Sequence, residues 1–174
     1  NLNTGSTGNV TTTRTGEAKL NLVGSNNQTV TGTVGGVGAS LEKVSSGATG
    51  ATSTFVNNVY ANTVENTGTG ATTFQDNVTA TNVNVNAGTS TFQDNLTATT
   101  TTITTGTGNF NTVSGTTTSN LQFTDNGTAN LNNGLTGNVT TTADNKGTLN
   151  LVGSNNQTVT GTVGNATTSL GNIN

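Results

Sequence analysis

A short segment recurs in the middle of the chain and sets the period of the structure that the chain can form. Residues 74–81 read FQDNVTAT, and residues 92–99 read FQDNLTAT. The same shift carries Phe92 to Phe110, and central repeats of this length cover residues 74–121. A unit this short, with so few large apolar side chains, cannot bury a core alone and must stack on its neighbours.

One large apolar residue per unit extends this series through the chain. The anchors are Leu2, Leu22, Leu41, Phe55, Phe74, Phe92, Phe110, Leu131, Leu151 and Leu170. The steps between them are close to the length of the central unit, except for a shorter step from Leu41 to Phe55, where we predict an irregular turn or loop. Nine steps at about 4.8 Å, the spacing of paired strands, predict a core about 43 Å long.

A longer repeat joins the two ends of the sequence. Residues 1–45 align with 130–174 at a constant offset of 129, and the segment 20–35 (LNLVGSNNQTVTGTVG) recurs unchanged as 149–164. The seven anchor steps from Leu2 to Leu131 together equal the same offset. We therefore predict that one long repeat holds about seven short ones and that the two periods nest.

The composition favours strands over helices. Thr, Val and Ile, which branch at Cβ, make up 64 of the 174 residues, and no window carries a helical apolar stripe. Within one unit, Val78 and Ala80 alternate with polar residues, as do Val83 and Val85 after a bend. We predict an all-β fold, a right-handed parallel β-helix (β-solenoid) with about 18–20 residues and three short strands per turn. Residues 1–174 would form one such solenoid, a fragment of a longer array.

Stacked units place like side chains in columns along the axis. We predict that Phe74, Phe92 and Phe110 form one interior column. A second interior column would contain Val85, Ile103 and Leu121, and a third column would bring the amides of Asn77 and Asn95 together.

The residue content excludes several classes of site. Without His or Cys, the usual zinc, haem and iron–sulfur ligand sets and the Ser–His–Asp and Cys–His nucleophiles are absent. Four Lys and Arg against seven Asp and Glu form no basic surface for nucleic acid, and no apolar run is long enough to cross a membrane. We predict a non-enzymatic protein without catalytic, cofactor-binding or metal-binding residues, without a nucleic-acid partner and without a membrane span.

Two acidic and two aromatic residues are candidate sites. Asp76 and Asp94 occupy the same position in adjacent units, where a carboxylate pair could cleave a glycoside or hold Ca²⁺. No Lys, Arg or third carboxylate stands at an equivalent position, so we interpret both as solvated turn residues. Tyr60 and Phe123 could contact a partner, but packing in or near the core is the favoured interpretation.

The basic residues of the first third stand close to acidic ones in the sequence. Arg14, Lys19 and Lys43 lie near Glu17 and Glu42. We interpret them as solvated ion pairs.

Rows of threonine suggest a second kind of function. The repeat would stack Thr79 with Thr97, Thr81 with Thr99, and Thr89 with Thr107, with an interruption where Thr91 faces Asn109. Thr99 faces Thr117 only if the same register continues. Regular Thr arrays on a flat β-solenoid are how several ice-binding proteins match the ice lattice. Threonine is also simply a soluble strand former. An ice-binding or carbohydrate-binding solenoid is therefore the alternative function.

Asn-, Thr- and Gly-rich units such as GNVTTT, NLVGSNNQTVTGTVG and TFQDNVTAT run through essentially the whole chain. In these motifs the chain resembles the passenger region of bacterial autotransporter surface proteins, most closely rickettsial surface cell antigens of the outer membrane protein B type. The resemblance implies a right-handed β-helix exported to the cell surface and displayed there as an adhesin or coat. We therefore expect a stiff structural or adhesive protein at the extracellular bacterial surface. Its expected partners are further copies, end to end or side by side, and a host-surface protein or glycan.

Overall fold

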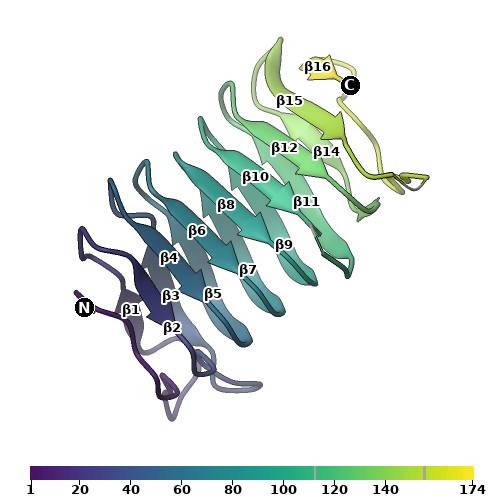
Figure 1. Ribbon diagram of the computed structural model, residues 1–174. Helices are drawn as coiled ribbons and strands as arrows, with labels where there is room; N and C mark the ends of the chain where they lie inside the picture. The colour runs from purple at the N-terminus through teal and green to yellow at the C-terminus, as the bar shows by residue number, and fades with distance from the viewer. Residues whose placement is uncertain (112, 155) are drawn as a thin grey trace.

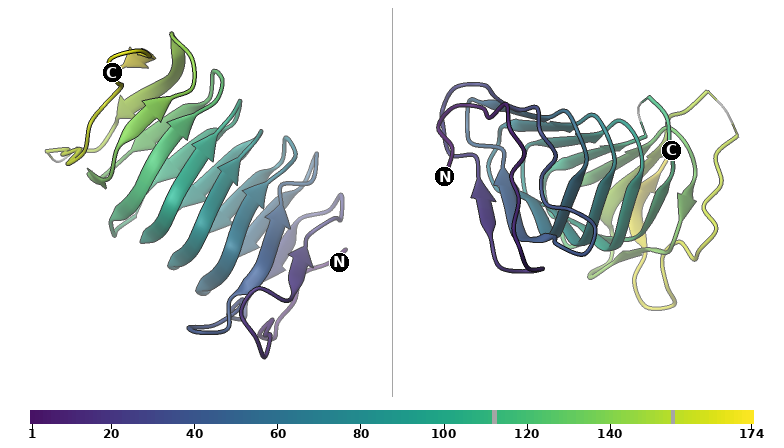
Figure 2. Two further views of the ribbon diagram at one scale, coloured as in Figure 1. Left: turned by 180° about the vertical axis from the view of Figure 1, so that it is seen from behind. Right: turned by 90° about the horizontal axis from the view of Figure 1, so that it is seen from below.

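The computed structural model describes residues 1–111, 113–154 and 156–174, and within these residues the chain is all-β with no helix. Parallel strands stack winding upon winding into an elongated β-solenoid, with the two termini at opposite ends (Figures 1 and 2). In Figure 1 the nearer strands point to the lower right while the chain advances to the upper right, which is a right-handed coil. The predicted fold class is confirmed.

One side of the solenoid, here called the straight sheet, is built from short strands that end on a large apolar residue. In spatial order it contains β16 (Leu170–Ile173), β15 (Lys146–Leu151), β12 (Thr128–Leu131), β10 (Thr107–Phe110), β8 (Thr89–Phe92), β6 (Ala71–Phe74), β4 (Thr52–Phe55) and β2 (Gln28–Val30). In each strand from β4 to β12 the second and fourth residues are buried and the first and third face outward. The strand pleat thus sends every second residue into the core.

The other two sides are formed by one sheet that bends along its length, here called the bent sheet. It contains β1 (Lys19–Asn21), β3 (Leu41–Ser46), β5 (Val59–Asn66), β7 (Val78–Val85), β9 (Leu96–Ile103), β11 (Thr117–Phe123), β13 (Leu135–Thr136) and β14 (Val139–Thr141). In β7 the inward residue Val78 is followed by two adjacent exposed residues, Thr81 and Asn82, and then by inward Val83 and Val85. The alternation changes phase at this bend, so each central winding has three sides. Two of the three predicted short strands are joined into one bent strand of eight residues in β7 and β9.

Four phenylalanine rings stack along the axis inside the straight sheet. The rings of Phe55 and Phe74 are 5.0 Å apart, those of Phe74 and Phe92 5.0 Å, and those of Phe92 and Phe110 5.4 Å, with interplanar angles of 3° to 8°. Each of these side chains is at most 2% exposed. Leu131 continues the column beyond Phe110. The predicted phenylalanine column is confirmed, and it forms the centre of the core.

The second predicted interior column is wrong at its last member. Val85 pairs with Ile103, but Ile103 pairs with Phe123, while Leu121 pairs with Thr101. The cause is the connection from Phe110 to Thr117, which is longer than the preceding connection from Phe92 to Leu96; the register shift at the bend of β11 removes only one of the added positions. Beyond β9, therefore, the residues that pair in adjacent windings are no longer separated by the offset of the central repeat. Phe123, interpreted as a packing residue, is fully buried.

The anchor series also combined residues from different columns. Leu22 and Leu41 belong to the bent sheet. Phe55 belongs to the straight sheet, where it pairs with Val30. The short step from Leu41 to Phe55 therefore joins two sides of one winding, and residues 47–51 form an ordinary connection between β3 and β4. Eight strands in the straight sheet give seven steps, about 34 Å at 4.8 Å each, instead of nine steps and 43 Å.

The long repeat does not contain a whole number of windings. Six windings lead through the paired residues Leu20, Val44, Val64, Val83, Thr101, Leu121 and Val139. The remainder of the offset of 129 takes the chain round the next corner to Leu149, in the straight sheet. The two copies of LNLVGSNNQTVTGTVG therefore begin on different sides of the solenoid, and the predicted nesting of the two periods is wrong. Asn155, within the second copy, lies outside the described residues.

Local stacking is nevertheless the same in both copies. Leu20 pairs with Val44 in the first copy, and their counterparts Leu149 and Ile173 pair in the second. Similarly, the bridge between Val10 and Val34 has its counterpart between Val139 and Val163. These windings exceed the predicted length, because their connections are longer than those of the central windings. The repeated sequence thus specifies how one winding lies on the next, whichever side it occupies.

Replacing Phe92 by Ala is expected to lower the free energy of unfolding by about 3–5 kcal/mol, because it opens a gap between two stacked rings. Thr73→Ala, an outward change on β6, is the matched control and is expected to cost about 1 kcal/mol or less. Urea unfolding followed by circular dichroism measures both. Similar losses for the two variants would show that the phenylalanine column is not the centre of stability.

Candidate functional surfaces

Two columns of small side chains, all of them polar except Ala71, cover the outer face of the straight sheet. The first column contains Thr52, Ala71, Thr89, Thr107, Thr128 and Thr148. The second contains Thr29, Thr54, Thr73, Thr91, Asn109, Asn130 and Asn150. Neighbours lie about 4.8 Å apart along a column and about 6.6 Å apart along a strand. The result is a regular two-column array without a charged residue.

The second column changes its chemistry along the axis. From Asn109 onward the side chains bond to one another: the amide of Asn130 donates to Asn109 Oδ1 at 2.7 Å, and that of Asn150 donates to Asn130 Oδ1 at 2.7 Å. Thr54 and Thr73 make no side-chain hydrogen bond within the described residues. The asparagine part therefore satisfies itself, while the threonine part presents hydroxyl groups to the outside.

The predicted threonine rows are correct in part. Thr89 pairs with Thr107, Thr91 faces Asn109, and Thr79 pairs with Thr97 as predicted. Thr81 and Thr99 stand at the bend, in equivalent positions between paired residues of β7 and β9. Thr99 does not face Thr117, because Thr117 pairs with Leu96 and is buried.

The full extent of the array was missed at the sequence level. The array residues are the first and third residues of each four-residue strand, and the fourth residue is the large apolar anchor. The strands read TSTF, ATTF, TSTF, TGNF and TANL. These short patterns become visible once the anchors of the straight sheet are separated from those of the bent sheet.

Asp76 and Asp94 stand at corresponding corners of adjacent windings, between the straight and the bent sheet. The Asp76 carboxylate accepts hydrogen bonds from the backbone N–H of Asn77 at 2.8 Å and from its side-chain amide at 2.6 Å. These bonds hold the turn that leads into β7, which supports the interpretation of Asp76 as a turn residue. Among the described residues, no three acidic side chains gather into a potential metal site.

The predicted asparagine column is confirmed at the same corners. The amide of Asn77 donates to Asn58 Oδ1 at 3.0 Å, and the amide of Asn95 donates to Asn77 Oδ1 at 2.7 Å. Asn95 Oδ1 in turn accepts the backbone N–H of Thr116 at 2.9 Å. A continuous chain of side-chain bonds thus fixes three successive corners.

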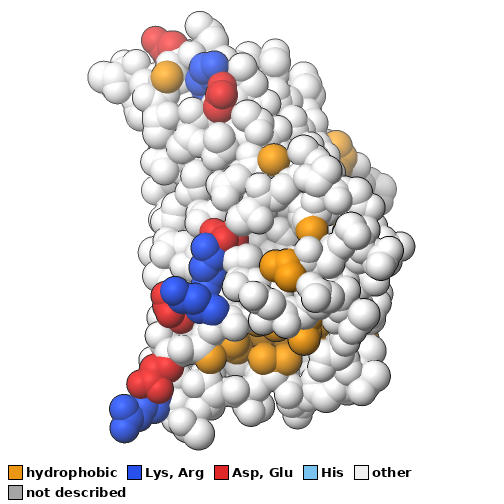
Figure 3. All heavy atoms as spheres, turned by 90° about the vertical axis from the view of Figure 1, so that its left-hand side faces the viewer, with side chains coloured by type: hydrophobic (Ala, Val, Ile, Leu, Met, Phe, Trp, Pro, Cys, Tyr) orange, Lys and Arg blue, Asp and Glu red, His pale blue; other side chains and the backbone are white. Residues whose placement is uncertain are grey.

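Each of the four cationic side chains is paired with a carboxylate. The pairs are Arg14–Glu17, Lys19–Glu42, Lys43–Glu65 and Lys146–Asp125. Figure 3 shows blue and red side chains next to each other along one edge, while most of that face is white. The interpretation as solvated ion pairs is confirmed for Arg14 and Lys19, but it is wrong for Lys43, which pairs with the buried Glu65. The surface therefore offers little net field to a charged partner.

The Lys146–Asp125 pair has a measurable electrostatic consequence. Lys146 Nζ donates to Asp125 Oδ1 at 2.7 Å. This bond, helped by the backbone N–H of Asn126 and by the lysine charge, lowers the pKa of the Asp125 carboxyl below its ordinary value.

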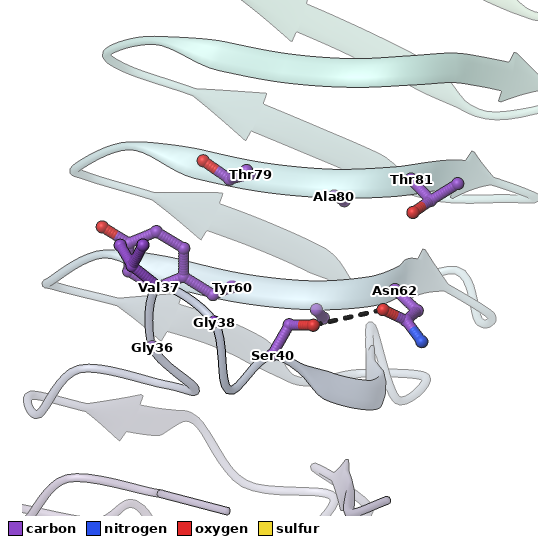
Figure 4. A pocket seen from close by; sticks show the side chains of 10 residues that line it. Gly36, Val37, Gly38, Ser40, Tyr60, Asn62, Thr79, Ala80 and Thr81 are labelled. Atoms are coloured by element: carbon purple, nitrogen blue, oxygen red, sulfur yellow. Dashed lines mark hydrogen bonds between the residues drawn. The ribbon is translucent and has the colours of Figure 1, made fainter. Parts of the chain in front are cut away.

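A hollow of about 410 Å³ opens on the bent sheet beside Tyr60, the single tyrosine of the chain. The turn around Val37 forms one wall, and Ala80 lies on the neighbouring strand (Figure 4). Ala61 also lines the hollow. A second hollow, of about 290 Å³, is lined by residues of β9, β11 and β13. Tyr60, expected to pack in or near the core, is half-buried and lines the first hollow.

No family model, no curated protein and no solved structure matches this chain. No helix among the described residues is long and apolar enough to span a membrane.

Proposed function

We propose that this protein is a non-enzymatic structural or adhesive surface protein, a stiff rod or coat displayed outside a bacterial cell. In this proposal it belongs to the passenger region of an autotransporter surface protein resembling the rickettsial antigens, and it contacts a host-surface protein or glycan. The observation that carries the proposal is the unbroken stack of eight parallel strands with a phenylalanine column at its centre.

The stack has the mechanical properties that such a role requires. Backbone hydrogen bonds of both sheets run along the axis, so bending the rod must stretch the bonds on its convex side and compress those on the concave side. The aromatic rings are close-packed between these walls, and close-packed interiors have low compressibility. Outside, hydroxyl and amide groups and paired charges keep the sides soluble and discourage unspecific contacts.

Display at the surface is tested on cells that make the protein. An antibody raised against the folded chain is expected to label intact cells as strongly as permeabilised cells, because the rod stands outside the envelope. An antibody to a cytoplasmic enzyme serves as the control and should label only permeabilised cells. Labelling by the first antibody that also requires permeabilisation would refute the proposal.

The ends of the rod support self-association end to end. At the C-terminal end Leu151 is 37% and Ile173 58% exposed, while their counterparts in the first copy, Leu22 and Val44, are 3% and 0% exposed because a further winding covers them. We propose that a further winding of the same kind covers these residues, and that for residues 1–174 taken alone the N-terminal winding of a second copy, around Leu2, can supply it. A head-to-tail contact of this kind does not close and extends into a filament.

Introducing charge at that end is expected to keep the protein monomeric. Ile173→Lys should abolish the concentration-dependent assembly that sedimentation velocity and electron microscopy detect in the unaltered chain, since a buried lysine would lack a partner. Val113→Lys, at an exposed position away from the ends, should assemble normally. Filaments that persist in Ile173→Lys, or an unaltered chain that stays monomeric, would contradict the proposal.

Ice binding is a second candidate function, favoured by the flat, uncharged Thr array of the straight sheet. If the array binds ice, the protein is expected to depress the freezing point below the melting point and to facet ice crystals. Thr107→Lys, in the middle of the array, should abolish both effects, because a long charged side chain prevents close contact with a flat surface. Thr118→Lys, on the outer face of the bent sheet, should leave them unchanged. Absence of both effects in the unaltered protein would remove this candidate.

A further inference from the structure

The hollow beside Tyr60 is walled by a turn that the structure holds firmly. Gly36 and Ala39 exchange backbone hydrogen bonds of 3.1 Å and 3.0 Å, which closes a tight turn with Gly38 at a φ of 74°. The hydroxyl of Thr15 donates to the Gly38 carbonyl at 2.9 Å and ties the turn to the preceding winding. Val37 stands at its tip with 87% of its surface exposed.

The floor and the far rim come from the bent sheet. Small side chains, Ala61 and Ala80, follow each other at the bend and leave the depression open. At one end of the rim Ser40 donates to Asn62 Oδ1 at 3.1 Å (Figure 4). At the other end the phenol ring of Tyr60 borders the hollow.

Several polar groups around the hollow have no partner in the protein. Within the described residues, the hydroxyls of Tyr60, Thr79 and Thr81 and the amide nitrogen of Asn62 make no hydrogen bond. None of the lining residues is charged. The hollow thus combines one aromatic ring and small apolar side chains with uncharged donors and acceptors.

Tyr60 is an exception within its own column. The corresponding positions in the next windings are Thr79, Thr97, Thr118 and Thr136. The turn also differs between the two copies of the long repeat: Val37 corresponds to Ala166, beside Asn165, whose side chain closes that turn with hydrogen bonds to Thr167 and Thr168. Both features that build the hollow are therefore departures from the repeat.

We propose that this hollow binds a neutral saccharide. A sugar ring has an apolar face that can lie on Tyr60 and Val37, and hydroxyls at its edge that can bond to Asn62, Thr79 and Thr81. A volume of about 410 Å³ lies within the range of small-molecule sites. An anionic ligand would find no cationic side chain in the lining, and a peptide strand would find no free sheet edge, because β5 is paired on both sides.

The second hollow extends the site along the rod. Its floor begins at Ala98, which pairs with Ala80 of the first hollow, and continues to Ser119 and Gly137. Thr118 and Thr136 continue the column of Tyr60 and Thr79 along its side. Three steps of about 4.8 Å separate Ala61 from Ser119, so a linear oligosaccharide lying parallel to the axis reaches both hollows.

The chain contains its own reporter for this site. Tyr60 is the only Tyr and there is no Trp, so tyrosine fluorescence reports on the hollow alone. Cellotetraose, maltotetraose, mannotetraose and chitotetraose are titrated separately into the folded chain. At least one is expected to change the fluorescence saturably, and trigalacturonate, an anionic trisaccharide, is expected to bind more weakly. No saturable change with any of the four neutral sugars, confirmed by calorimetry, would overturn the proposal.

Variants locate the binding. Tyr60→Thr, which inserts the residue that the next winding carries, should weaken binding by about tenfold in calorimetry. Val37→Thr should weaken it in the fluorescence titration, while Val113→Thr, an exposed valine outside both hollows, should not. Circular dichroism confirms that each variant is folded. Binding that survives Tyr60→Thr unchanged would overturn the assigned place. The inference rests on the glycan contact in the proposed function. Its failure in the sugar titrations would leave the surface display, which antibody labelling tests separately, unaffected.

Discussion

The structure depends on one constraint: each side chain must be compatible with the side chain one winding away, about 4.8 Å along the axis. Parallel pairing fixes the backbone of a winding onto the next, and the residue at each position then meets its counterpart directly. Rings stack on rings in the straight sheet, and amides bond amides at the corners. Where the register changes in β11, a buried Thr101 enters a column of aliphatic residues, and the Ser119 hydroxyl, 2.9 Å away, provides its partner.

The same constraint explains which parts of the fold the sequence predicts. The nearly identical recurrence FQDN(V/L)TAT predicted the phenylalanine column, the asparagine column and the number of residues per winding in the centre of the chain. The sequence did not reveal the side on which an anchor lies, because Leu41 and Phe55 are equally apolar although they belong to different sheets. Nor does the repeat show that the connection from Phe110 to Thr117 is longer than the preceding ones, so Leu121 was assigned to the wrong column. The hollow beside Tyr60 depends on a turn from another winding, a contact that no local pattern encodes.

The two copies of the long repeat share the way in which one winding packs on the next, but they do not begin on the same side of the rod. One period of it makes six windings and one further side, so the second copy stacks on its neighbours as the first does but begins on another side of the rod. Sequence identity is kept in LNLVGSNNQTVTGTVG, which contains the residues that pack between windings, while charged residues such as Arg14 and Glu17 are replaced. Selection for stacking alone would produce this pattern, because stacking depends on the residues in the two adjacent windings and does not depend on the side of the rod that a residue occupies.

The different starting sides of the two copies distinguish between a one-sided binding surface and a rod with several contact directions. In an array of such long repeats, each copy would be turned by one side relative to the copy before it. A flat Thr array could then not continue along one side, because the residues that form it would move to the next side in the following copy. A local feature that recurred in each copy would instead be presented in three directions in turn. That arrangement suits a rod that meets partners from any direction, and it limits a one-sided binding plane to the length of a single repeat.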